Sequence, residues 1–92
     1  MDNSLLEAIE AALREIRPMT AASFAPAVTI ERQLDWCRNY ELGLPAESRP
    51  GPFSMGLIAV REFDMYGNNP ELSTLINEVQ RRVEAKLART SA

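Results

Sequence analysis

Residues 55–60 (MGLIAV) form the densest apolar run in this chain of 92 residues, and any fold must supply neighbours for them. Apolar side chains at nearly every position are typical of a central, buried helix, which is expected to begin near Phe53 or Ser54. Ile58 and Val60 would also suit a buried strand. No other segment reads as a strand that could pair with this one, and an unpaired central strand would leave its backbone unsatisfied. The helix is therefore favoured.

Two glycines and an aspartate add detail to this helix. Gly56 in a helix interior costs about 1 kcal/mol relative to alanine, which predicts that another helix approaches closely there. Gly67 is expected to end the helix in the left-handed conformation. By helical projection Asp64 shares the direction of Leu57 and Val60 and should face inward, where it would cap the next helix or pair with an arginine.

The N-terminal segment predicts an amphipathic helix. Ser4 and Glu7 have the spacing of a capping box. The helix is expected to end near Arg17, because Pro18 cannot donate the next backbone hydrogen bond. The apolar residues that share its buried stripe are Leu5, Leu6, Ile9, Ala12, Leu13 and Ile16.

A loop over residues 19–25, held by Phe24, leads to a second helix whose first turn contains Pro26. Ala27, Ile30, Leu34 and Cys37 should form its buried face. Cys37, the only cysteine, is interpreted as a small buried hydrophobe because the chain has no histidine to activate it.

A separate row on this second helix consists of Arg32, Trp36 and Tyr40, spaced four residues apart and rotated roughly 120° from the buried face. These residue types are over-represented at the energetic centres of protein interfaces. Trp36 and Tyr40 would equally suit a seam with a neighbouring helix. The two roles are compatible, since an aromatic ring at a seam can still offer an edge to a partner.

The remainder of the chain contains a breaker-rich loop and a last helix. Residues 41–52 hold two glycines and three prolines, which no helix interior tolerates. Asn69 should cap the last helix and Pro70 should open it, with Glu71 complementing the helix dipole. Its apolar stripe consists of Leu72, Leu75, Ile76, Val79, Val83 and Leu87.

These segments predict an all-α fold, a small single-domain bundle of about four helices over residues 1–92, with the third helix enclosed by the others. The apolar residues are spread along the chain, so no membrane span is expected. The first residues lack the pattern of a secretory signal, and the single cysteine suits a reducing compartment. A cytoplasmic location is therefore expected.

The chain has few of the side chains that commonly catalyse reactions or bind metals. Histidine is absent and a lone cysteine cannot build a thiolate metal site. Glu62, Asp64 and Glu71 gather around the last turn with Asn68 and Asn69, but their spacing matches no metal-binding loop. We therefore expect no enzymatic activity, no cofactor and no metal.

Charge predicts the kind of partner. The net charge is -3 and the isoelectric point is about 4.9, which argues against nucleic acid. Residues 1–77 hold 11 acidic and 6 basic residues, whereas residues 78–92 hold 2 acidic and 4 basic residues. A partner attracted by charge should be basic and should meet the first three quarters of the chain. Alternatively, the basic residues of segment 78–92 only complement the negative end of the dipole of the last helix.

Three segments resemble, in order and spacing, parts of a small family of type VI secretion immunity proteins. They are residues 31–36 (ERQLDW), 57–64 (LIAVREFD) and 69–73 (NPELS). The second segment, which passes from apolar to acidic, is the most specific. The resemblance extends over most of the chain, from about Leu5 to Gln80.

Two regions depart from the family: the proline-rich loop 43–52, which is longer, and the turn 65–69. Members of the family neutralise an effector whose toxin domain is an NAD(P)+ glycohydrolase. The resemblance implies an all-helical cytoplasmic protein that binds this domain, blocks its active site and has no activity of its own.

Three hypotheses follow, of which the least favoured is an enzyme that uses Glu62 and Asp64. The first is an antitoxin that occludes its toxin, with Arg32, Trp36 and Tyr40 as anchors and an acidic edge formed by Glu62, Asp64, Asn68 and Glu71. The second is a structural or adaptor protein, including a homodimer that buries the aromatic row against itself.

Overall fold

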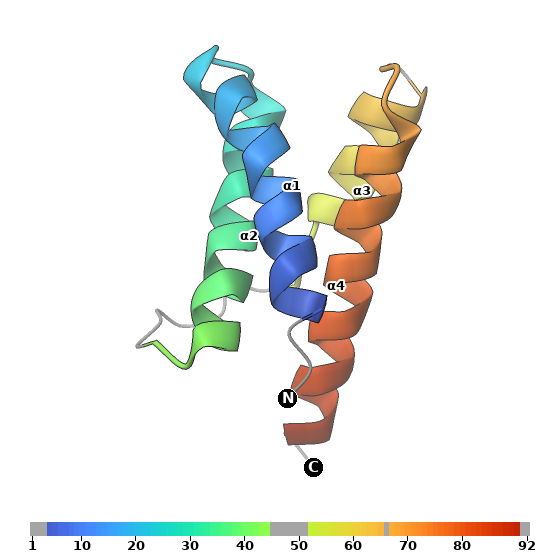
Figure 1. Cartoon of the computed structure of the whole chain (residues 1–92). Coiled ribbons are helices and arrows are strands. Elements are labelled where there is room, and N and C mark those ends of the chain that lie inside the picture. The colour runs from blue at the N-terminus through green and yellow to red at the C-terminus, as the bar shows by residue number, and fades with distance from the viewer. Residues whose placement is uncertain (1–3, 45–51, 66, 91–92) are drawn as a thin grey trace.

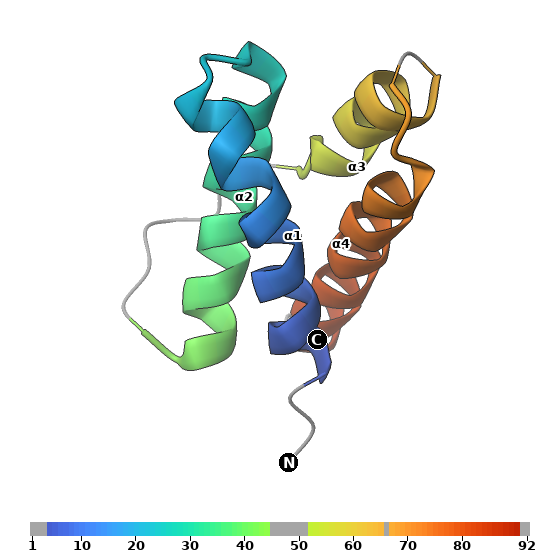
Figure 2. The same cartoon turned by 45° about the horizontal axis from the view of Figure 1, so that its top comes forward.

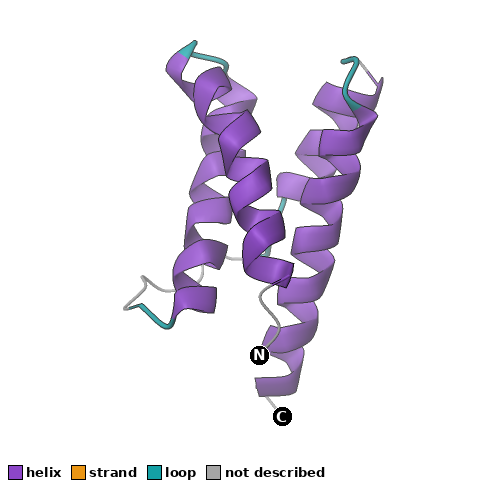
Figure 3. Ribbon diagram, viewed as in Figure 1, coloured by secondary structure: helices purple, strands orange, loops and turns teal. Residues whose placement is uncertain are grey.

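The computed structural model describes residues 4–44, 52–65 and 67–90, and nearly all of these residues are helical (Figure 1). No strand occurs among them (Figure 3). The elements in chain order are α1 (Ser4–Ala21), α2 (Ala25–Leu42), α3 (Met55–Ala59), the π-helical segment η1 (Val60–Met65) and α4 (Pro70–Thr90). The expected all-α bundle is confirmed.

The helices form two antiparallel pairs. α1 and α2 make the first pair, while α3 and η1 run back along α4 to make the second (Figures 1 and 2). α1 also packs on α4, and α2 contacts the start of α3. No described helix is both long and apolar enough to cross a membrane.

One hydrophobic core joins the two pairs. The stripes predicted on the first, second and last helices supply most of it and are confirmed except at Leu6, which is only partly buried and is not part of the core. Leu75 and Leu87 are partly buried against it. The segment before and within α3 and η1 adds four more side chains. The fully buried core residues include Ile9, Ile16, Ile30, Leu34, Cys37, Met55, Ile76 and Val83.

The predicted enclosure of the third helix is wrong. α3 and η1 use one side against α4 and the end of the first pair, and the other side faces solvent. Leu57 is 74% exposed and Met65 is 67% exposed. The reason is geometric, because a single turn of α3 continued by η1 lies along the edge of the bundle, whereas α1 lies between α2 and α4 (Figure 1).

The predicted end of the first helix near Arg17 is also wrong, since α1 continues through Pro18 to Ala21. Proline removes one hydrogen bond, but its carbonyl still accepts from Ala22, and Met19 accepts from Phe24 (both 3.0 Å). Met19 also packs against the core, which compensates for the missing bond. The connection is therefore shorter than the predicted loop over residues 19–25.

The ends of α2 follow the sequence signals. Pro26 occupies the first turn, and Gly43 ends the helix at φ 70°. The Gly43 amide donates to Tyr40 at 3.2 Å and the Leu44 amide donates to Asn39 at 3.0 Å, which closes the last turn. Residues 45–51, the middle of the predicted loop, lie outside the described part of the chain.

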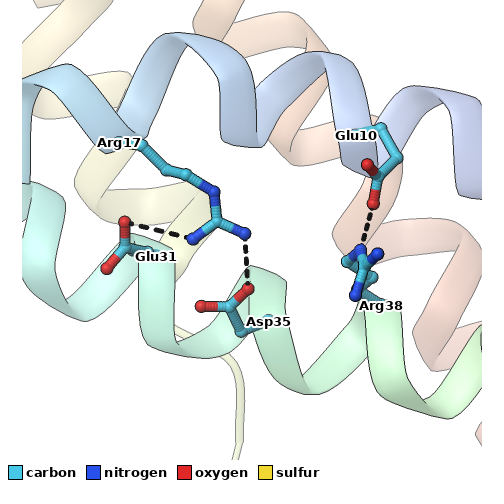
Figure 4. Close-up of polar contacts among 5 residues, drawn as sticks. All are labelled: Glu10, Arg17, Glu31, Asp35 and Arg38. Atoms are coloured by element: carbon cyan, nitrogen blue, oxygen red, sulfur yellow. Dashed lines mark hydrogen bonds and ion pairs between the residues drawn. The ribbon is translucent and has the colours of Figure 1, made fainter.

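Ion pairs fix α1 against α2 (Figure 4). The Arg17 guanidinium lies 3.0 Å from Asp35 and 3.5 Å from Glu31, and Arg38 pairs with Glu10. The hydrogen bond with Asp35 raises the pKa of Arg17, so its charge is permanent. These half-exposed pairs orient the two helices more than they stabilise them.

Candidate functional site

The N-terminus of α3 is held by a buried glutamine from α2. The Gln33 Oε1 accepts hydrogen bonds from the backbone amides of Ser54 (3.0 Å) and Met55 (2.9 Å), while its Nε2 donates to the Ser54 hydroxyl (3.0 Å). Two of the amides that a helix N-terminus leaves unpaired are thereby satisfied. Gln33 thus fixes α3 to the first helix pair.

Two side-chain amides of α4 hold Gly56, the next residue of α3. The Gly56 amide donates to the Gln80 Oε1 at 2.9 Å, and the Asn77 Nδ2 donates to the Gly56 carbonyl at 3.1 Å. A Cβ built on Gly56 would lie 2.5 Å from the Asn77 Oδ1. The close helix approach predicted at Gly56 is confirmed, and side-chain amides make it.

The π-helical segment determines which side chains face outward. Residues 57 and 65 would differ by about 80° on a regular α-helix. The wider turn of a π-helix rotates less per residue and brings them closer to one direction. Leu57, Arg61 and Met65 are all exposed, whereas Ala59 and Phe63 between them are buried. We call these three exposed side chains the outer face.

The acidic edge predicted at the end of this segment is exposed, with one exception. Asp64, Asn68 and Glu71 are exposed, whereas Glu62 is partly buried and lies 2.9 Å from the Arg61 guanidinium. Asp64 and Glu71 make no ion pair with any residue that the structure describes. The edge is therefore a region of uncompensated negative charge.

The inward orientation predicted for Asp64 is wrong. Asp64 is exposed, and so is Leu57, with which it was expected to share a buried side. Capping of α4 falls to Asn69 instead, as also predicted, because its Oδ1 accepts from the Leu72 amide at 3.3 Å. Pro70 opens the helix.

Gly67 serves the turn through its small size. It does not adopt the predicted left-handed conformation, since Gly43 is the only glycine with a positive φ in the described residues. A Cβ on Gly67 would lie 2.4 Å from the Glu62 carbonyl oxygen and 2.9 Å from the Phe63 Cα. The turn therefore folds directly onto the backbone of η1.

The aromatic row of α2 covers a seam. The Trp36 ring stacks on Tyr40, with centroids 5.4 Å apart and an interplanar angle of 15°, and it contacts Phe53 at 5.9 Å. Trp36 packs against the core but is only partly buried, as is Tyr40. Arg32 is exposed. The seam role is thus confirmed for Trp36, which contacts the segment before α3, while the ring contact of Tyr40 is with Trp36 on its own helix. Both residues are partly exposed.

The two halves of the predicted site are separated along α3 and η1. Trp36 lies beside Phe53, which precedes α3, whereas Asp64 lies near the end of η1. These positions are about 15 Å apart along the helix axis. A partner of ordinary size could touch both halves, since a typical interface uses about 800 Å² from each protein.

The described residues contain no group of three acidic, cysteine or histidine side chains able to hold a metal ion. No acidic residue that the structure describes is fully buried. Comparison of the chain with protein-family models, curated proteins and solved structures finds no match in any of the three.

Sequence reasoning missed the three amides, Gln33, Asn77 and Gln80, that hold α3. One signal was present: Gln33 stands beside Leu34 on the apolar side of α2, where it is 7% exposed. A buried glutamine must find hydrogen-bond partners, and the nearest unpaired groups in any helical bundle are helix ends.

Proposed function

We propose that this protein is an immunity protein that binds the toxin domain of a type VI secretion effector, an NAD(P)+ glycohydrolase, and blocks access to its active site. The exposed, uncompensated carboxylates Asp64 and Glu71 at the η1–α4 turn carry the proposal. A cleft that binds an anionic dinucleotide is expected to be basic, and a negative surface complements it.

The arrangement of the three family-like segments supports the proposal. Residues 31–36 lie on α2, residues 57–64 form most of α3 and η1, and residues 69–73 begin α4. Gln33 of the first segment bonds the start of α3, and the Asn69 amide of the third donates to the Phe63 carbonyl at 3.0 Å. The segments therefore converge on one region around α3 and η1.

Five of the ten basic side chains pair with a carboxylate of a described residue. They are Arg17, Arg38, Arg61, Arg81 and Lys86. Asp64 and Glu71 have no such pair, and they contribute to the net charge of -3 at the η1–α4 turn. Such a surface would both attract a basic cleft and occupy it.

The test uses the purified toxin domain of a type VI secretion effector that hydrolyses NAD+. Purified wild-type protein, added in stoichiometric amounts, is expected to abolish NAD+ hydrolysis by that domain and to hydrolyse no NAD+ itself. Replacing both carboxylates of the turn (Asp64→Arg with Glu71→Arg) should weaken inhibition at least 10-fold, because attraction becomes repulsion.

Glu15→Arg is the matched control. Glu15 is exposed on α1 and makes no ion pair with a described residue, so its reversal changes the net charge without touching the turn. This variant should inhibit within about 2-fold of wild type. Unimpeded NAD+ hydrolysis in the presence of wild-type protein, or NAD+ turnover by the protein alone, would refute the proposal.

A further inference from the structure

We propose that the outer face, formed by Leu57, Arg61 and Met65, is the apolar centre of the partner-binding surface, and that it docks into an apolar groove bordered by basic side chains. This inference rests on the proposed function, since it takes the toxin domain as the occupant. It assigns the centre of binding to α3 and η1 rather than to the aromatic row of α2.

Exposure sets Leu57 and Met65 apart from the other large apolar side chains. They are 74% and 67% exposed, and the next most exposed, Val28, reaches 50%. The two lie on one helical surface about two turns apart, so a single partner element can cover both. Two large apolar side chains this exposed on one short segment, next to the exposed charged residues Arg61 and Asp64, suit the apolar centre and polar border of a protein-binding site.

Rigidity makes this surface suitable for binding. Gln33 holds the start of α3, Gln80 and Asn77 hold Gly56, and Gly67 packs the following turn onto η1. Ala59 and Phe63 anchor the opposite side in the core. The outer face is thus presented in a fixed conformation, which lowers the entropic cost of association.

Charge identifies the occupant. Glu62 neutralises Arg61 at 2.9 Å, and Asp64 and Glu71 add two uncompensated negative charges at the end of the face. A groove with an apolar floor and lysine or arginine at its border complements both features. The cleft of an enzyme that binds NAD(P)+ has these properties, because it must accommodate both the flat rings and the phosphates of the dinucleotide.

The same charges disfavour a second copy of this chain. In a two-fold symmetric dimer through the outer face, the second copy would bring the same uncompensated negative charge to the interface. Like charges brought together at an interface oppose binding. The acidic edge therefore selects against self-association through this face and in favour of a basic partner.

The experiment measures the binding of Leu57→Ser, Met65→Ser and Val28→Ser to the same toxin domain by isothermal titration calorimetry. Each outer-face variant should bind at least 10-fold more weakly, and the double variant at least 100-fold more weakly, because central apolar contacts dominate binding. Val28→Ser, a half-exposed apolar residue on α2, should bind within about 2-fold of wild type. Circular dichroism should show unchanged melting for all variants.

The outcomes separate the two proposals. If wild type binds tightly and the outer-face variants bind equally well, the outer face is excluded while the proposed function stands. If wild type does not bind the toxin domain, the proposed function fails and this inference fails with it. If light scattering shows a wild-type dimer that Leu57→Ser converts to a monomer, the occupant is a second copy and the inference is overturned.

Discussion

Replacing Gln33 with leucine tests whether the amide bonds hold α3 in place. Leucine has a similar volume but accepts no hydrogen bond, so the Ser54 and Met55 amides lose their partner. Met55 is 0% exposed, and an unpaired buried amide costs about 1–3 kcal/mol. Ser54 is only half-buried and can turn to water, while leucine regains about 1 kcal/mol through apolar burial. The net loss is about 1 kcal/mol.

Urea unfolding followed by circular dichroism measures this loss. For a chain of 92 residues, 1 kcal/mol corresponds to a fall in melting temperature of roughly 5 °C. Gln33→Glu is the matched control, because its carboxylate still accepts both amide bonds and should cost clearly less at pH 7. A Gln33→Leu protein that loses less than about 0.5 kcal/mol would refute the assigned role.

Hydrogen exchange distinguishes local from global loss. If Gln33 fixes α3 specifically, the amides of Met55 and Gly56 should exchange faster in Gln33→Leu than the loss of global stability requires. Amides in the middle of α1 should change only with global stability. Equal acceleration everywhere would show that the contribution of Gln33 is not local.

Three further changes test the turn and the last helix. Gly67→Ala should cost about 2 kcal/mol by thermal melting, because the new Cβ would lie 2.4 Å from the Glu62 carbonyl oxygen, a backbone atom; an unchanged melting temperature would contradict this contact. Asn69→Ala should cost about 1 kcal/mol by urea unfolding through loss of the cap, and Asn69→Asp should cost less; equal effects would contradict capping. The Arg81 hydrogen bond lowers the pKa of Glu78 below 4.5, so its contribution is present above that pH and disappears as pH falls through the lowered pKa. The stability difference between wild type and Glu78→Gln should therefore shrink between pH 7 and pH 3 in urea titrations, and a constant difference would refute the pairing.

Much of the fold was predictable because its signals are local. The stripes of α1, α2 and α4, the proline at the start of α2 and the cap at Asn69 depend only on residues within a few positions of one another. Cys37 was correctly placed in the core for the same reason. The helical period determines the buried face wherever a helix is long and polar residues mark the other side.

The errors fall where local rules compete with tertiary contacts. Pro18 lies inside α1 because Met19, one residue later, packs against the core and extends the helix. Gly67 is required by a close backbone approach rather than by its torsion angle. The π-helical turn of η1 has no signature in the sequence, and it altered the direction of every residue after Val60.

Exposed apolar residues are harder to predict than the core, because an apolar residue has the same sequence signature in both places. A helix as apolar as residues 55–60 reads as fully buried, yet Leu57 remains 74% exposed in the free protein. Burying such a side chain stabilises a protein by about 2 kcal/mol, and this chain leaves that stabilisation unused on the outer face. Polar residues such as the nearby Arg61 and Asp64 could stand in place of the exposed apolar residues of the outer face at no cost to the fold. Departures from local patterning of this kind concentrate at functional surfaces, and here the departure lies beside the uncompensated carboxylates. The proposed binding surface therefore lies at Leu57, where the sequence predicted a buried side chain and the structure has an exposed one.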